Sequence, residues 1–300
     1  MKKIYLIMIT VFMISFIVQG ASKIPILNEK SIKLSQEEIK FIKELNKKGR
    51  VKIATTYQEN TYYIDSDGKI KGFHYKLAND FASKIGVKLD IKIVDEWSKY
   101  FIKKGEDIER VKTDEKYSYT PDLFNEVEIY VAGITALSWR EKLFDIVKFI
   151  PNKQMVVCRR DENIKKIGDL NNKSAVFVKN SSFENNFLKL LTKNKLNTKI
   201  IYEEDFVKTS VMVSEGKDIF TIHDSDNAFK AVAEYKNLTI AFPISDFEMI
   251  GWGVSKNNRI LTSILTKYIK YARDNGTIDK YWKETFGVTF SEYMRVLEYR

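Results

Sequence analysis

The chain has 300 residues, of which 44% are hydrophobic and 30% are charged. These fractions are normal for a soluble globular protein and suit one large domain or two of ordinary size. The formal net charge is +10, but the lysines are spread along the chain among carboxylates, without a run of five or more like charges. The composition therefore argues against nucleic-acid binding, and the single cysteine, Cys158, excludes an internal disulfide bond.

Residues 1–21 have the pattern of a cleaved secretory signal peptide. Positions 2 and 3 are basic, residues 4–18 form an apolar run interrupted only by Thr10 and Ser15, and residues 20–22 are small. This run is too short for a comfortable membrane span of ~20 residues. We therefore expect export to the periplasm, with an uncleaved N-terminal anchor as the alternative. Cys158 lies far from residue 21, so no lipid anchor is expected on the mature N-terminus.

Residues 22–48 form an N-terminal arm ahead of the first predicted strand. Ser35 and Glu38 have the spacing of a capping box, in which each side chain accepts a hydrogen bond from the other residue's backbone N–H. Apolar residues at positions 34, 39, 42 and 45 would lie near one helical face. A helix that begins directly after Ser35 is therefore predicted.

From residue 49 onward, short strand-like runs alternate with helical patterns. Strands are predicted over residues 51–55, 89–94, 128–132, 154–159, 175–179, 199–202, 219–222, 238–242 and 250–254. Helices are predicted over residues 75–85, 182–191, 206–215, 227–235 and 259–273, with a further short helix around residues 281–282. Such alternation predicts an α/β fold with largely parallel sheets.

Two segments resemble the same known family. Residues 133–145 read Gly-Ile-Thr-Ala-Leu-Ser-Trp-Arg-Glu-Lys-Leu-Phe-Asp, and residues 274–287 read Asp-Asn-Gly-Thr-Ile-Asp-Lys-Tyr-Trp-Lys-Glu-Thr-Phe-Gly. Both resemble signature segments of the family 3 periplasmic solute-binding proteins. The resemblance implies two α/β lobes joined by two hinge crossings, near residues 149–153 and 243–246. Lobe 1 would then comprise residues 49–150 with the returning residues 246–300, and lobe 2 residues 151–245.

In lobe 1, the resemblance places the ligand carboxylate on Thr135 and Arg140. Gly133 and Thr135 stand at the end of a predicted strand, where open α/β sheets carry their ligand sites. Arg140 offers a planar fork of donors that matches a carboxylate. The alternative for Arg140 is an exposed side chain in the first turn of a helix. The family's usual threonine three residues before the arginine is replaced by Leu137.

In lobe 2, a helix N-terminus and an acid are expected to face the same ligand. Lys179, Ser181 and Ser182 follow a predicted strand and open a helix, whose backbone N–H groups can receive an anionic group. Asp224 follows another strand and resembles the family's acid for the ligand ammonium group. Simple helix capping is the alternative for both serines and for Asp224. Tyr57, in the loop after the first strand, is a further candidate for contact with the ligand.

Several other patterns do not support a metal, cofactor or catalytic site. Residues 65–68 begin like a calcium loop, but Lys76 occupies the position of the required acid, so a hairpin turn is predicted there. His74, His223 and one cysteine give no zinc spacing. We therefore expect no metal, no cofactor and no catalytic residues.

In detail, the sequence also resembles the solute-binding half of the lytic murein transglycosylase F group and related sensor ectodomains. Residues 121–124, 224–225 and 250–252 carry this closer resemblance, and because the chain stops at Arg300 the catalytic half is expected to be absent. The main hypothesis is a monomeric periplasmic receptor that captures an amino acid, a peptide or a similar solute for an ABC-type permease. The second is a cell-wall sensing module that binds muropeptides or partners a murein hydrolase. A hydrolase or lyase built on the binding fold is the third.

Overall fold

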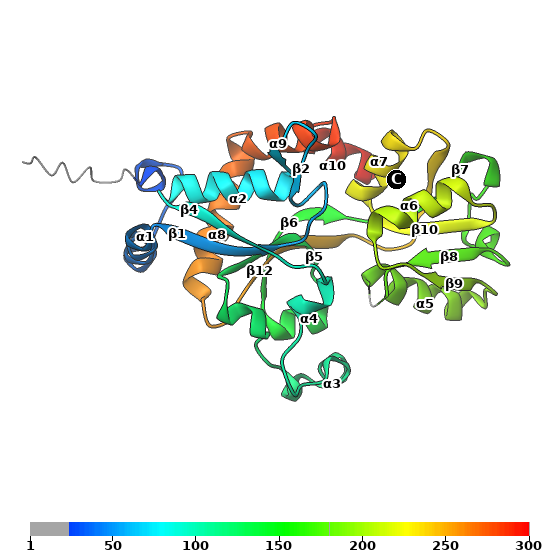
Figure 1. The fold of residues 1–300 in the computed structure, drawn as a ribbon, viewed down its shortest axis with the longest axis horizontal. Helices are drawn as coiled ribbons and strands as arrows, with labels where there is room; N and C mark the ends of the chain where they lie inside the picture. The colour runs from blue at the N-terminus through cyan, green and yellow to red at the C-terminus, as the bar shows by residue number, and fades with distance from the viewer. Residues whose placement is uncertain (1–23, 180, 300) are drawn as a thin grey trace, which may run out of the picture.

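The computed structural model describes residues 24–179 and 181–299, which form two α/β lobes lying side by side along the long axis (Figure 1). The predicted signal peptide, residues 1–21, lies outside the described residues. The predicted two-lobed α/β fold is confirmed, because each lobe is built on its own five-stranded sheet with helices on both faces. The prediction of largely parallel sheets is wrong, since each of the two sheets has as many antiparallel as parallel strand pairings.

The sheet of the first lobe has the order β4-β1-β5-β12-β6. Strand β1 runs parallel to β4 and β5, whereas β12 runs antiparallel to β5 and β6. The late strand β12 thus returns to a sheet begun far earlier in the sequence. The bounds are Arg50–Thr55 for β1, Lys88–Ile93 for β4, Ile129–Thr135 for β5, Asp145–Asn152 for β6 and Glu248–Val254 for β12.

Local sequence signals define the ends of the first-lobe helices. Ser35 and Glu38 form both hydrogen bonds of the predicted capping box at the start of α1. Helix α8 ends at Asp274, Asn275 follows as its C-cap, and Gly276 adopts the left-handed conformation with φ of 80°. The bounds are Gln36–Lys48 for α1, Phe73–Lys84 for α2, Ile108–Thr113 for α3, Ser138–Leu143 for α4, Arg259–Asp274 for α8, Thr277–Phe286 for α9 and Phe290–Tyr299 for α10.

The sheet of the second lobe has the order β11-β7-β10-β8-β9, with α5 on the opposite side from α6 and α7 (Figure 1). Strands β8, β9 and β10 are parallel, and β7 is antiparallel to β10 and β11. The strands are Gln154–Arg159 (β7), Ser174–Phe177 (β8), Lys199–Tyr202 (β9), Ile219–Asp224 (β10) and Leu238–Pro243 (β11). The helices are Ser182–Asn194 (α5), Phe206–Glu215 (α6) and Ser225–Glu234 (α7).

Two crossings join the lobes. Only Lys153 separates β6 from β7, and residues 244–247 lead from β11 back to β12. Both crossings connect the ends of extended strands, an arrangement that lets two lobes rotate about a narrow hinge.

Residues 95–128 carry no strong periodic pattern in the sequence, and they fold as short helical turns on the lower face of the first sheet. The turns Trp97–Tyr100 and Asp122–Asn125 contribute to an aromatic cluster, and Glu115–Tyr117 forms a further turn without buried residues. In that cluster Phe124 stacks on Tyr130 at 4.0 Å between ring centroids, and Trp97 meets Phe101 edge to face at 4.8 Å. This packing holds Trp97 at the edge of the sheet that faces the second lobe.

Smaller elements complete the described chain. The hairpin of β2 and β3 turns on Asp65, whose carboxylate accepts from the backbone N–H groups of Asp67 and Lys69. The predicted turn, rather than a calcium loop, is therefore present. Strands β2 and β3 span Tyr63–Ile64 and Ile70–Lys71, and the remaining helical turns span Pro25–Asn28, Arg160–Glu162 and Ile167–Leu170.

The buried His74 predicts a pH-dependent stability of the first lobe. Its Nδ1 accepts a hydrogen bond from Trp252 Nε1 at 2.9 Å, and burial lowers the His74 pKa to about 3. In the unfolded chain the histidine pKa is near 6.5, so the unfolded state binds a proton that the folded state does not bind. The free energy of unfolding therefore decreases as the pH falls below 6.5. Between pH 6.5 and 4.5, His74→Gln is expected to gain about 2 kcal/mol relative to the wild type, measured by urea unfolding. A difference that stays constant with pH would contradict this reading, and Asn257→Ala serves as an exposed control.

Candidate functional site

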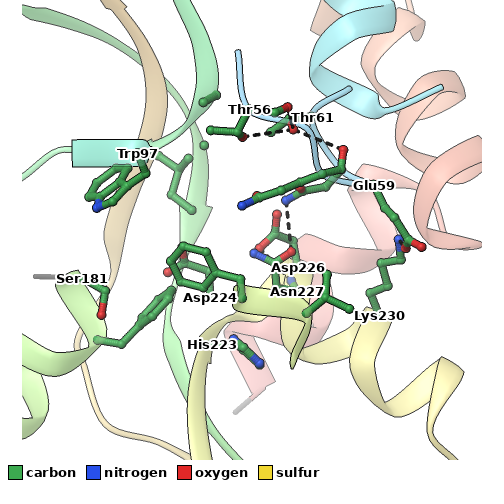
Figure 2. A pocket seen from close by; sticks show the side chains of 18 of the residues that line it. Thr56, Glu59, Thr61, Trp97, Ser181, His223, Asp224, Asp226, Asn227 and Lys230 are labelled. Carbon is green, nitrogen blue, oxygen red and sulfur yellow. Dashed lines mark hydrogen bonds and ion pairs between the residues drawn. The ribbon is translucent and has the colours of Figure 1, made fainter. Parts of the chain in front are cut away.

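A cavity of about 130 Å³ lies between the two lobes (Figure 2). The first lobe contributes the loop after β1, the end of β5 and helix α4, while the second contributes the N-terminal end of α5, part of α6 and one side of α7. The polar residues of the lining include Thr56, Glu59, Asn60, Thr61, Thr135, Arg140, Ser181, Ser182, His223, Asp224, Asp226, Asn227 and Lys230.

Arg140 is a buried cation with unsatisfied hydrogen-bond donors. It is 1% exposed, and its guanidinium carbon lies 4.5 Å from the ring centroid of Trp97 and 5.1 Å from that of Trp139. Nη1 donates to the carbonyl oxygen of Thr135 at 3.0 Å, whereas Nε and Nη2 have no partner among the described residues. Burial lowers the Arg140 pKa to about 9, although the charges of Asp224 and Glu248 oppose that shift. The alternative of an exposed arginine does not describe this side chain.

Asp224 ends β10 and directly precedes α7. Its carboxylate is buried and accepts a hydrogen bond from Asn152 Nδ2, while Asn152 Oδ1 accepts from the backbone N–H and the hydroxyl of Ser225 at 2.8 and 2.9 Å. Burial, followed by the charges of Asp226 and Glu248, raises the Asp224 pKa well above its usual value. The Asp224 side chain does not cap α7. Instead, Asn152 at the hinge orients it.

The serines that open α5 differ in what they do. Ser181 is the N-cap of α5, and its hydroxyl accepts from the backbone N–H of Glu184 at 3.2 Å, as the capping alternative describes. The hydroxyl of Ser182 lies 3.4 Å from that of Thr135, so the two lobes meet directly beside Arg140. Both serines and Thr135 are buried in the cavity wall.

The structure brings together six of the eight predicted ligand-binding residues. The cavity is lined by Gly133, Thr135, Arg140, Ser181, Ser182 and Asp224. Lys179 is exposed and outside the lining. Tyr57 is 56% exposed, and its ring packs edge to face on Tyr62 at 6.3 Å between centroids. Strand β5 runs through Gly133 and Thr135, which were expected at the strand end and in the following loop.

The lining also contains residues that the sequence did not single out. Figure 2 shows Asp226 and Asn227 of α7 facing the loop that carries Glu59 and Thr61. Asn60 Nδ2 donates to Asn227 Oδ1 at 3.0 Å, and Lys230 forms an ion pair with Glu59. A signal for Asp226 was available, since it stands two residues after Asp224 and directly before the helix predicted over residues 227–235. Trp97 offered none, because its segment has no periodic pattern.

Gly72 fixes how closely the loop of residues 56–61 approaches the start of α2. Gly72 adopts φ of 114°, and a Cβ atom there would lie 2.4 Å from the carbonyl oxygen of Thr61. Only glycine allows so close an approach. The loop of residues 56–61 is thereby held against the N-terminus of α2, and Thr61 Oγ1 donates to the carbonyl oxygen of Thr56 at 2.7 Å.

His223 belongs to the packing of the second lobe rather than to a proton relay. Its Nε2 lies 2.9 Å from Ser210 Oγ and 3.3 Å from Thr209 Oγ1, and burial lowers its pKa to about 4. Across the described residues, no group of three histidine, cysteine, aspartate or glutamate side chains is arranged to hold a metal ion.

The fold and the interlobe cavity define a protein with the two-lobed periplasmic-binding architecture. Among solved structures, it is similar to a mutant of ArgBP from T. maritima, with 20% identity, a TM-score of 0.63, and coverage of 82% of this chain and 99% of that one. A solute receptor for L-cysteine of Neisseria gonorrhoeae matches with 18% identity and a TM-score of 0.64, over 81% of this chain and 92% of the receptor.

Curated sequences point to the same group, and the predicted resemblance to family 3 solute-binding proteins is confirmed. Membrane-bound lytic murein transglycosylase F of Aliivibrio fischeri is 25% identical over 253 residues, which are 82% of this chain and 47% of that protein. The L-cystine-binding protein TcyA of Bacillus subtilis is 24% identical over 258 residues, covering 83% of this chain and 85% of TcyA. The chain thus spans about half the length of the transglycosylases it matches. No family model matches the sequence.

None of the helices in residues 24–179 and 181–299 combines the length and the apolar character needed to cross a membrane.

Proposed function

We propose that this protein captures one small amino-acid-like or peptide solute between its lobes and presents it, outside the cytoplasm, to an ABC-type membrane permease. The observation that carries the proposal is that one cavity is lined by two buried groups of opposite charge, Arg140 and Asp224, which lie on different lobes. Arg140 keeps two donors free for a carboxylate, and Asp224 on the other lobe offers an acceptor for an ammonium group. The amino-acid receptors among the similar proteins, including the L-cystine-binding TcyA, support this reading.

The ligand would act by bridging the lobes. Arg140 and Thr135 belong to the first lobe, whereas Ser182 and Asp224 belong to the second. A solute that touches both favours the closed state through contacts that the open state does not offer. Closure also removes water from the charges, which strengthens each ion pair while part of the gain is offset by desolvation. In this role the chain acts as a monomer without enzymatic activity.

The size of the cavity favours a small solute over a muropeptide. Its volume is about 130 Å³, close to the ~150 Å³ of a protein cavity that admits benzene. A muropeptide site would be expected to have a broader cleft lined by tyrosines of the first loop. Tyr57 of that loop is exposed and lies outside the lining of the cavity. The similarity to transglycosylase F nevertheless supports cell-wall sensing as the second candidate function.

Thermal unfolding of residues 22–300 against amino acids, dipeptides and muropeptides tests both functions. A ligand at 100 times its dissociation constant is expected to add about 2.7 kcal/mol of stability to the folded state. A shift with an amino acid or dipeptide that Asp224→Asn weakens supports the transport receptor. A shift with muropeptides alone supports wall sensing. The absence of any shift would overturn the proposed binding site.

A further inference from the structure

The charges of the cavity do not balance for a simple zwitterion. Arg140 is the one buried cation there without an ion pair among the described residues, because Lys230 is paired with Glu59. Two carboxylates are buried in the lining of the same cavity: Asp224 is 5% exposed and Asp226 is 4% exposed. In the described part of the chain, neither carboxylate has a lysine or arginine nitrogen within ion-pair distance. Buried charges are costly unless they are paired.

An α-amino acid with an uncharged side chain would satisfy only part of this arrangement. Its carboxylate would meet Arg140 and its ammonium group Asp224, and Asp226 would remain unpaired. Burial raises the Asp226 pKa to about 6, although the backbone N–H of Asn227, which donates to the carboxylate at 2.8 Å, and the Asn60 amide both favour the charged form. These neutral donors leave its negative charge uncompensated.

Helix α7 shows where a second cation would lie. Asp226, Lys230 and Glu234 are spaced four residues apart, so they share one face of α7, and all three line the cavity. The lining continues to Tyr235, about 14 Å along the helix from Asp226 at 1.5 Å per residue. The exposed Glu234 lies near the outer end, and the Glu59–Lys230 pair lies between. The cavity is therefore elongated along an acidic helix face.

We propose that the solute is a diamino monocarboxylic acid, such as lysine or ornithine, and that Asp226 selects its second cationic group. This inference rests on the proposed function and sharpens it. Arg140 binds the single carboxylate, Asp224 the α-ammonium group, and Asp226 the ammonium group at the end of an unbranched side chain. The added charge leaves Asp224 and Asp226 both paired, which a neutral amino acid does not achieve.

Isothermal titration of residues 22–300 with lysine, ornithine, norleucine, glutamine and cystine tests the inference. Norleucine has the length of lysine without the terminal ammonium group, so the pair isolates the second charge. Lysine or ornithine is expected to bind at least about tenfold more tightly than norleucine, which corresponds to about 1.4 kcal/mol. Asp226→Asn is expected to reduce that preference to within about twofold while norleucine still binds. Retained norleucine binding shows that the variant is folded.

The controls separate this inference from the function on which it rests. Asp274→Asn changes an exposed carboxylate at the end of α8 and is expected to leave the lysine preference intact. Norleucine or glutamine binding as tightly as lysine would mean that Asp224 and Asp226 share one ammonium group, which overturns the inference but keeps the binding function. Tighter binding of cystine than of lysine would overturn it as well. A failure of all five amino acids to bind would overturn the inference, and the proposed function would fall with it only if no dipeptide shifts the thermal unfolding either.

Discussion

Replacing Arg140 with methionine is expected to abolish solute binding and, at the same time, to stabilise the solute-free protein. Removing one partner of a buried, hydrogen-bonded charge pair typically costs 2–5 kcal/mol of binding, roughly a 30- to 5,000-fold loss of affinity. Arg140 is the only predicted partner for the ligand carboxylate that has buried donors free among the described residues.

The gain in stability follows from the cost of burying the charge. The Arg140 pKa falls to about 9 even though Asp224 and Glu248 attract the cation, so burial outweighs their attraction. Methionine keeps apolar contact with the faces of Trp97 and Trp139. The carbonyl oxygen of Thr135, which Arg140 would release, still accepts the backbone N–H of Leu137 at 2.9 Å. By comparison with other buried charges replaced by apolar groups, the gain is expected to be about 1–4 kcal/mol.

Chemical unfolding of the solute-free protein and titration with its ligand measure the two effects separately. Arg50→Met is the matched control, because Arg50 is exposed and its ion pair with Asp90, at 3.7 Å, is exposed as well. We expect that control to change stability by less than about 0.5 kcal/mol. Destabilisation by Arg140→Met would show that the arginine holds the apo structure together instead of awaiting a ligand.

Asn152→Ala is expected to destabilise the protein by about 3–5 kcal/mol, because it breaks a buried network around a carboxylate. Asn152 is fully buried at the end of β6, donates to Asp224 and accepts two hydrogen bonds from Ser225. The alanine would leave the Asp224 carboxylate and the Ser225 backbone N–H without these partners. Protonation of Asp224 relieves part of the cost, so the loss is expected to be larger at pH 8 than at pH 5.

A double-mutant cycle checks the assignment. In an Asp224→Ala background, the cost of Asn152→Ala is expected to shrink, since the carboxylate that needs the amide is gone. Equal costs in both backgrounds would show that Asn152 supports the hinge without positioning Asp224. The Tyr293 hydroxyl, 2.7 Å from the Ser225 hydroxyl and 2.9 Å from the Pro151 carbonyl oxygen, provides a second contact at the same hinge.

The sequence by itself determined the local elements and the part of the site that lies at strand ends. The capping box at Ser35, the left-handed stop at Gly276 and the alternation of strands and helices are short-range features, and the structure contains each of them. Arg140 and Asp224 were proposed as ligand residues from their resemblance to family motifs near strand ends, and both line the cavity.

Only the tertiary structure decided what lies across the cavity. Trp97 reaches Arg140 through an aromatic cluster built from an aperiodic segment, and Asp226 faces a loop of the other lobe. Tyr57 could not be excluded from the lining by sequence alone, because the loop's path depends on the close approach of Gly72 to Thr61. Contacts between residues more than a hundred positions apart, such as Asn60 with Asn227, depend on how two lobes meet. Periodicity and local spacing in the sequence carry no information about how the two lobes are placed against each other.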